Sequence, residues 1–326
     1  MTPADLSLTV LRAVRRAVGE GALRAPAGLP ERVTVERPRP GGRGDWATNA
    51  ALQLARGAGM PPLGVAEVLR PRIAEAEGVA HVEITGPGFL NITLADHGGR
   101  TLVRRVLTEG PRYGHGTALA GRVFRLDHPG EPRATVLADV LRRLLAAQGA
   151  ALHGAETDTL TLRPLPAPPS CDPRVFGDDA VRWAMLRPAG HDRVLDPAAL
   201  LVQGEANPLF TVRYAHSRVR ALLRNAAALG FAPSYDEDVD APRLLPALGD
   251  HPAVLEAAAR HRAPDRVARH LEATADAFLG FQHTVLPLGD EKPSAAHRSR
   301  LALAEAAGTV LAGGLALLGI SAPDYL

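Results

Sequence analysis

The alternation of apolar and polar positions predicts a mixed helix and strand fold for the first 95 residues. VTVERPRP (33–40) alternates like a strand until its prolines, and HVEITGPGFLNITLA (81–95) consists of two strand-like runs interrupted at Gly86-Pro87-Gly88. Apolar positions at helical spacing occur in the opening segment, after GGRGDWATN, and in PPLGVAEVLRPRIAEAEG. We therefore expect an α+β domain with small helices on one sheet.

The middle of the chain has the outline of a strand, a turn and a helix. GRVFRLD (121–127) is a short strand, HPGE (128–131) a tight turn, and residues 134–148 a helix with one apolar face. A helix N-terminus after a glycine-containing turn favours an anion there, although any βα unit shares this outline. TLTLRPL (159–165) is one further strand before a proline-rich loop. A doubly wound nucleotide fold needs several such repeats, and only one or two are visible.

The last third of the chain is helical. LFTVRYAHSRVRALLRNAAALG (209–230) has apolar positions three and four apart and ends on a glycine, as a helix C-terminus does. Three more helices are expected at 252–261, 264–286 and 294–318, which predicts an all-α bundle. We divide the chain into an α+β domain (1–115), a reduced α/β segment (116–200) and the bundle (201–326).

The basic residues are almost all arginine, since Lys292 is the only lysine. Guanidinium groups suit bidentate phosphate contacts and stacking on bases, but the net charge of +2 is modest and arginine can also follow coding bias. The single cysteine, Cys171, excludes an internal disulfide, and no metal site is expected. The N-terminus has no signal-peptide pattern, and the best apolar run, 309–320, is short for a membrane span. We expect a cytoplasmic protein with no membrane association.

Four segments, in the same order along the chain, share a family resemblance. VERPRPGGRGDWATNAALQLA with GPGFLNITL resembles the additional N-terminal domain of the arginyl-tRNA synthetase family, which contacts the elbow of the tRNA. GDDAVRWAMLRP (177–188) is similar to the element after the second signature loop, and NPLFTVRYAHSRVRALLRNA (207–226) to the first helix of the DALR anticodon-binding bundle. The tail down to SAPDYL resembles the end of that bundle. The resemblance implies that 116–200 is a reduced Rossmann-like catalytic remnant.

HPGEPRATVLADVLRRLLAAQGA is similar to the first signature of class I synthetases, in a degenerate form. His128 and Gly130 match the family's His-x-Gly, and Glu131 stands where the family has histidine or glycine. In the family this turn holds ATP phosphates, which a carboxylate should repel. Arg133 is a further candidate phosphate contact. The lysine-rich second signature has no counterpart, because Lys292 lies in GDEKPS within the bundle. No catalytic residue is assigned, and no cofactor is expected; ATP would bind only if the remnant keeps a pocket.

The tRNA-facing candidates lie in the two end domains. Phe89 and Asn91 match the GPGF-x-N region near the tRNA elbow, where an aromatic ring stacks and an amide reads a base edge; a core position for Phe89 is the alternative. SAPDYL replaces a SAPERM-like ending close to the anticodon and departs from it in its last three residues. For the arginines and the bundle residues the alternatives are solvated surfaces and helix packing. The remaining candidates are Arg37, Arg39 and Arg43 beside the glycine-rich turn, Arg213, Tyr214, His216, Arg218 and Arg220 in the bundle, and Tyr325 in the tail.

These features favour a tRNA-binding protein of the arginyl-tRNA synthetase type, a pseudoenzyme without arginine activation. Its partner would be tRNA, with arginine-accepting tRNA as the first candidate, and the oligomeric state is not predicted. One alternative is an enzyme of altered chemistry that uses aminoacyl-tRNA, or a residual arginine–tRNA ligase; a deep pocket at His128 would favour it. The other is a scaffold partner of a true synthetase, which an exposed apolar face without arginines would favour.

Overall fold

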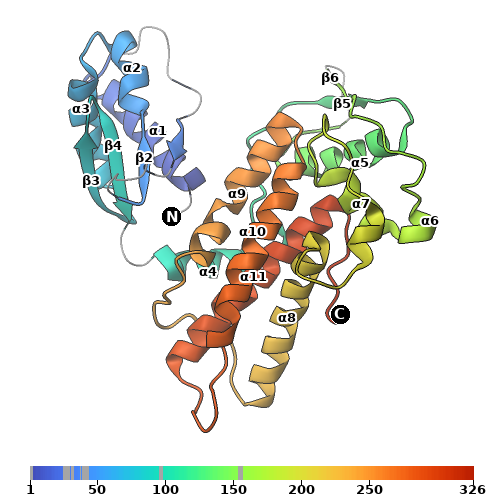
Figure 1. Cartoon of the computed structure of the whole chain (residues 1–326). Helices are drawn as coiled ribbons and strands as arrows, with labels where there is room; N and C mark the ends of the chain where they lie inside the picture. Colours follow the sequence, from blue (N-terminus) through green and yellow to red (C-terminus); the bar gives the residue numbers. More distant parts are fainter. Residues whose placement is uncertain are drawn as a thin grey trace. The chain divides into compact units, whose positions relative to one another are not determined.

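The computed structural model describes residues 3–24, 30, 33–36, 38, 44–94, 98–152 and 157–326. The chain forms two compact units, Met1–Leu102 and Val103–Leu326 (Figure 1). Each is described by itself. The first unit combines helices and strands and the second ends in a helical bundle, as the sequence pattern predicts.

The first unit is an antiparallel sheet with three helices packed against it (Figure 1). The strand order is β1-β2-β4-β3, with the bounds β1 (Val35–Glu36), β2 (Trp46–Thr48), β3 (Val79–Thr85) and β4 (Phe89–Leu94). The helices are α1 (Pro3–Gly19), α2 (Ala50–Ala58) and α3 (Pro62–Ala74). Apolar positions of α1 and α3 meet alternate residues of β4, among them Leu6, Leu69, Leu90 and Ile92, in one buried core.

The turn between β3 and β4 explains the GPG interruption in the sequence. Thr85 pairs with Phe89 at the end of the ladder. Gly88 has a φ of 134°, and a Cβ there would lie 2.8 Å from the carbonyl oxygen of Pro62. Only glycine satisfies both the backbone conformation and the close approach to the start of α3. The hairpin is thereby fixed against the helix that covers it.

The second unit begins with α4 (Gly98–Glu109), whose first residues belong to the first unit, and the 3-10 turn η1 (Gly110–Arg112). One parallel strand pair follows. Strands β5 (Phe124–Asp127) and β6 (Asp158–Thr161) pair in parallel register, with Phe124 opposite Asp158. Helix α5 (Pro132–Ala147) connects them, which makes a single βαβ unit. The chain then passes through α6 (Pro173–Phe176), α7 (Asp178–Leu186) and η2 (Pro197–Leu201).

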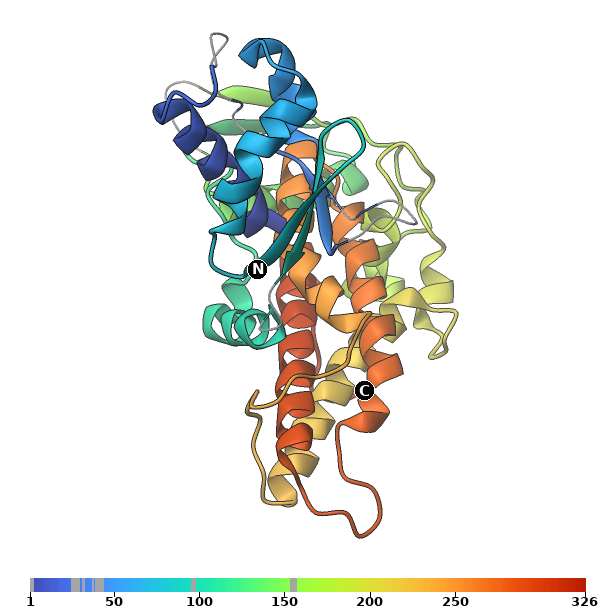
Figure 2. The same ribbon diagram turned by 90° about the vertical axis from the view of Figure 1, so that its left-hand side faces the viewer.

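The bundle consists of α8 (Pro208–Ala228), α9 (Leu244–His261), α10 (Asp265–Phe281) and α11 (Ala295–Leu318), with η3 (Gln282–Thr284) after α10. The four helices run alongside one another in both views (Figures 1 and 2). Helix α9 begins at Leu244, earlier than the sequence predicts, because Pro252 lies inside the helix and does not start it. Proline removes one backbone hydrogen bond there, and Pro252 is among the buried residues of the helix.

Helix α11 is the most apolar of the bundle helices. Within the described part of the chain it is the one helix long and apolar enough, by length and composition, to cross a membrane, with a window of mean hydropathy 1.8. The apolar run predicted from Thr309 was too short, because buried apolar residues also precede it, at 301–304 and 306–307 on either side of Glu305. The window is 78% buried in the fold, where it packs against α8, α9 and α10. Its apolar residues form the centre of the bundle.

Candidate functional site

The His-x-Gly turn lies between β5 and α5, and its last residue caps the helix. Glu131 has an extended backbone and precedes Pro132, which starts α5. One carboxylate oxygen of Glu131 accepts from the backbone N–H of Arg133 at 3.0 Å, and the other accepts from that of Ala134 at 2.9 Å. The first oxygen also accepts from the N–H of Ala167 at 2.9 Å. An internal carboxylate therefore occupies the anion position at this helix N-terminus.

The other two signature residues make few contacts. His128 is partly exposed, and its Nδ1 lies 3.2 Å from the carbonyl oxygen of Pro129. Gly130 is exposed, with open space where a Cβ would stand. The structure thus brings His128, Gly130 and Glu131 together in one turn, but only the carboxylate is engaged with the helix. No group of three or more metal-ligating side chains is placed to hold an ion in the described segments.

Arg133, next to this turn, is buried and links α5 to other segments through hydrogen bonds to their backbone. Only 2% of the residue is exposed, and burial lowers the pKa of its guanidinium. A guanidinium has five N–H donors, and here each one meets a backbone carbonyl. The acceptors are Met185 at 3.0 Å from Nε, Leu165 at 2.9 Å and Asp192 at 2.6 Å from Nη1, and Ala189 at 2.9 Å and Pro188 at 3.4 Å from Nη2. The hypothesis that Arg133 contacts a phosphate is therefore wrong, because no donor remains for one.

Helix α8 carries all five of the bundle candidates. Tyr214 is 40% exposed and its ring stacks on Phe210, with the centroids 5.7 Å apart. Arg218 donates from Nε to the side-chain oxygen of Gln282 at 2.7 Å. Arg213 lies 3.7 Å from the Asp179 carboxylate, and its buried Nε has no hydrogen-bond partner within the described structure. The exposed Tyr214 ring, backed by the partly buried Phe210, is available for stacking.

His216 is the buried member of the set. Its Nδ1 lies 3.0 Å from the carbonyl oxygen of Pro323, which assigns the proton to Nδ1. Burial lowers the pKa of His216, so the imidazole is neutral at pH 7. The residue therefore fastens the end of the chain to α8 and does not present a charge.

The C-terminal segment Ile320–Leu326, which we call the tail, lies along α8 (Figure 1). The Asp324 carboxylate accepts from Nε of Arg220 at 3.0 Å and from its Nη2 at 3.3 Å. The guanidinium of Arg224 lies 4.1 Å from the centroid of the Tyr325 ring, which is 72% exposed. Ser321 is held by both oxygens of Asp179. Tail and helix together form one surface of arginines and aromatic rings.

Sequence reasoning missed two members of this surface. Arg224 follows Arg220 by four residues, a spacing that places both on one helix face, and this signal was available in the sequence. Asp324 could not be found this way, because its partner Arg220 lies 104 residues earlier in the chain. The structure therefore shows that the surface of α8 and the tail contains the carboxylate of Asp324 besides the arginines recognised in the sequence.

Two candidates of the first unit, Phe89 and Asn91, lie at the hairpin between β3 and β4. Phe89 opens β4 and is 39% exposed, so its ring is accessible for stacking. Asn91 is buried, and its amide donates to the hydroxyl of Thr85 at 2.7 Å. Arg37, Arg39 and Arg43 lie outside the residues that the structure describes. Of these candidates, the exposed ring of Phe89 is the one that the described structure offers to a partner.

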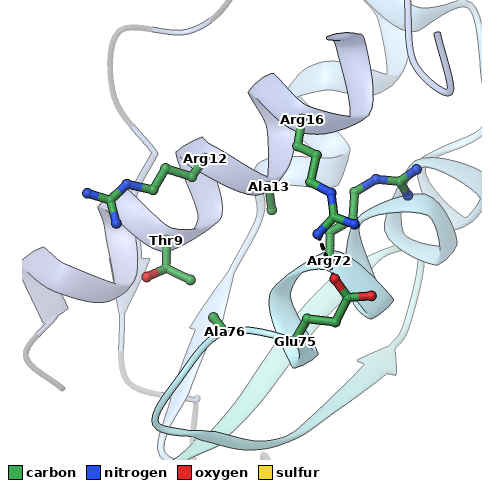
Figure 3. A pocket seen from close by; sticks show the side chains of 7 residues that line it. All are labelled: Thr9, Arg12, Ala13, Arg16, Arg72, Glu75 and Ala76. Carbon is green, nitrogen blue, oxygen red and sulfur yellow. Dashed lines mark hydrogen bonds and ion pairs between the residues drawn. The ribbon is translucent and has the colours of Figure 1, made fainter. Parts of the chain in front are cut away.

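A hollow of 240 Å³ lies between α1 and α3 (Figure 3). Arg16 from α1 binds Glu75 at 2.6 Å and Glu20 at 2.7 Å, and Arg72 from α3 binds Glu20 at 2.5 Å. Figure 3 shows the Arg12 side chain directed away from this network. The two carboxylates balance the two bound arginines, so the hollow has no concentrated charge of one sign.

Comparison with known proteins places these features in a family. Residues 8–94 match the model of the arginyl tRNA synthetase N terminal domain, and residues 212–326 match the DALR anticodon binding domain. The chain belongs to the arginyl-tRNA synthetase family. The resemblance read from the sequence is thereby confirmed. Members of this family bind tRNA through the DALR anticodon-binding domain.

Relatives in the arginyl-tRNA synthetase family have positions that this chain lacks. The chain is 26% identical to the arginine–tRNA ligase of Pseudarthrobacter chlorophenolicus over 554 positions, with both chains fully covered. This chain has 326 residues, so at least 228 of the 554 positions are occupied by the relative alone. The chain is also 41% identical to the arginine–tRNA ligase of Kineococcus radiotolerans over 177 residues, which cover 48% of this chain and 32% of that ligase.

The fold agrees with solved structures of the same family. Thermus thermophilus arginyl-tRNA synthetase matches with a TM-score of 0.70 at 14% identity, covering all of both chains. Arginyl-tRNA synthetase from Plasmodium falciparum matches with a TM-score of 0.65 at 9% identity, covering 98% of this chain and 99% of that one. At these identities the similarity establishes the fold.

Proposed function

We propose that this chain is a tRNA-binding protein of the arginyl-tRNA synthetase type that does not activate arginine. The observation that carries the proposal is the position of Glu131. Its carboxylate takes three backbone N–H groups at the turn where the family's signature would hold ATP phosphates. A triphosphate at this turn would meet a like charge and would find these donors already used.

The groups that would stabilise a leaving pyrophosphate do not gather at this turn. Activation of an amino acid requires positioned ATP and cationic donors for the charge that develops on the phosphates. Arg133, the guanidinium nearest in sequence to the turn, donates all five N–H groups to carbonyls. Lys292 lies in the segment between η3 and α11, in the bundle. These placements support a chain without arginine activation and without a bound cofactor.

The single β5–α5–β6 unit supports a reduced, Rossmann-like core. Doubly wound folds bind nucleotides in a crevice between strand ends, where the strand order reverses. A two-stranded parallel sheet has no such reversal. The positions occupied by the relatives alone leave room for the missing repeats in those enzymes. We infer that the remnant serves to join the two tRNA-binding ends.

Binding of tRNA is supported by the retained end domains and the α8 surface. Arginine–phosphate contacts and stacking on the exposed rings of Tyr214 and Tyr325 would supply the affinity. Arginine-accepting tRNA is the first candidate partner because of the family, and the cytoplasm is the compartment where it would be met. Such binding should weaken steeply with salt, since phosphate contacts release counterions.

Arginine-dependent exchange between ATP and pyrophosphate, with tRNA present, tests the missing activation. We expect no exchange above the reaction without arginine, because the signature turn lacks a phosphate site. The arginine–tRNA ligase of Pseudarthrobacter chlorophenolicus serves as the positive control under the same conditions. Arginine-dependent exchange that is lost on His128→Ala would contradict the proposal, because it would show that the turn still handles ATP.

A further inference from the structure

We propose that the tail competes with RNA for helix α8, because Asp324 occupies the phosphate-binding fork of Arg220. The inference rests on the proposed function, since it describes how the same surface would be regulated. It assigns to Asp324 a role in setting the strength of RNA binding. The surface described above would then be partly closed by the chain itself until RNA displaces the carboxylate.

The geometry of the Arg220–Asp324 pair carries the first step. The Nε and Nη2 donors of Arg220 each meet one carboxylate oxygen, at 3.0 and 3.3 Å. This two-pronged arrangement is the one in which arginine also binds a phosphate. A phosphate and the Asp324 carboxylate therefore cannot use these two donors at the same time.

The contacts of the tail with Arg224 also resemble those that a bound nucleotide would make. The main-chain oxygen of Asp324 accepts from Nη1 of Arg224 at 3.5 Å, and the Tyr325 ring lies under the same guanidinium. A guanidinium over a planar ring is an arrangement that arginine also adopts with a nucleic-acid base. The tail thus presents an anion to Arg220 and a ring to Arg224, two successive arginines on one face of α8.

The pair is exposed enough to be displaced. The side chains of Arg220 and Asp324 are 46% and 49% exposed, and ion pairs at such positions contribute little to stability. The tail has other anchors, because His216 contacts Pro323 and Asp179 holds Ser321. Removing the charge of Asp324 should therefore free Arg220 without detaching the tail. Glu305, whose pKa is raised by burial, is a further acidic group near Arg220 and is unchanged in the variants below.

A double-mutant cycle with Asp324→Asn and Arg220→Gln tests the proposal by titration of arginine-accepting tRNA over a salt series. Asp324→Asn is expected to bind about threefold to tenfold more tightly at low salt and to steepen the slope of log K against log salt by about 0.7 to 0.9, one added phosphate contact. In the Arg220→Gln background the same substitution should change the affinity by less than about twofold, because the guanidinium donors for which Asp324 and a phosphate compete are then absent.

Asp158→Asn is the matched control. This substitution removes the same charge from an ion pair of similar exposure, between Asp158 at the start of β6 and Arg122. It should leave the affinity within about twofold of the parent. An unchanged Asp324→Asn affinity would overturn the inference while the proposed function stands. A gain that persists with Arg220→Gln would also overturn it, because only net charge would then be acting. Failure of the parent chain and all variants to bind tRNA would contradict the proposed function, and with it the inference.

Discussion

Arg133→Met is expected to lower the free energy of unfolding of the second unit by about 3 to 5 kcal/mol. Methionine fills much of the side-chain volume but donates no hydrogen bond, so five carbonyls lose their partner, one in a buried hydrogen bond and four in part-buried ones. These carbonyls belong to the loop after β6, to the last turn of α7 and to the segment that follows α7. The loss should therefore loosen the connection between the β5–α5–β6 unit and the segments that lead into the bundle.

Urea denaturation of the full chain, followed by circular dichroism, measures this effect. Arg142→Met is the matched control, because Arg142 lies on the same helix α5 and is exposed. We expect the control to change the free energy of unfolding by no more than about 0.5 kcal/mol. Equal stability of the two variants would show that the five contacts of Arg133 do not tie the remnant together.

Acidification from pH 7 to pH 5 is expected to destabilise the bundle by about 2 kcal/mol through His270 alone. Burial lowers the pKa of His270 from 6.5 to about 4, and it lowers that of His251 further. The two rings stack with centroids 5.2 Å apart, and His251 also stacks on Tyr113. Between pH 7 and pH 5, His270 becomes protonated in the unfolded chain but stays largely neutral in the folded chain. The free energy of unfolding therefore falls as the pH falls.

His270→Phe should remove the His270 share of this pH dependence while keeping an aromatic ring in place. The measurement is the difference in unfolding free energy between pH 7 and pH 5, which also cancels a pH-independent loss from the substitution itself. His261→Phe is the control, because His261 is exposed at the end of α9 and should leave the difference unchanged. The same drop in parent and His270→Phe would contradict the assignment to His270.

Local patterns predicted much of the fold. The GPG turn, the β5–turn–α5 outline and the helical spacing of α8 each depend on neighbouring residues, which the sequence shows directly. The error at α9 also had a local cause. Pro252 was taken as the first residue of the helix, whereas α9 begins at Leu244 and contains Pro252. Predictions failed mainly where a contact joins distant segments.

Arg133 shows why the site was harder to predict. Its five acceptors lie between residues 165 and 192 and come together only when that segment folds over α5. The same holds for Glu131, whose charge was recognised but whose bond to Ala167 was not. Arg133 was assigned to an external phosphate and Glu131 was expected to repel one, and in both cases the fold supplies the partner from within the chain.

Internal partners also change the meaning of the arginine-rich composition. Arg133 is bound to carbonyls, Arg218 to Gln282, and Arg220 to Asp324. An arginine count therefore overstates the cationic surface that an RNA would meet. We therefore expect tRNA binding to depend on the few guanidinium groups that are exposed or that RNA can free from an internal partner.

Equilibrium binding of arginine-accepting tRNA across a salt series, with and without ATP and arginine, distinguishes a tRNA-binding protein without arginine activation from an active synthetase and from a scaffold. We expect binding that weakens linearly on a log–log salt plot and is the same with and without ATP and arginine. Absence of binding at low salt would contradict this expectation and would favour a scaffold role. Binding that strengthens when ATP and arginine are added would also contradict it, because the remnant would then hold both substrates.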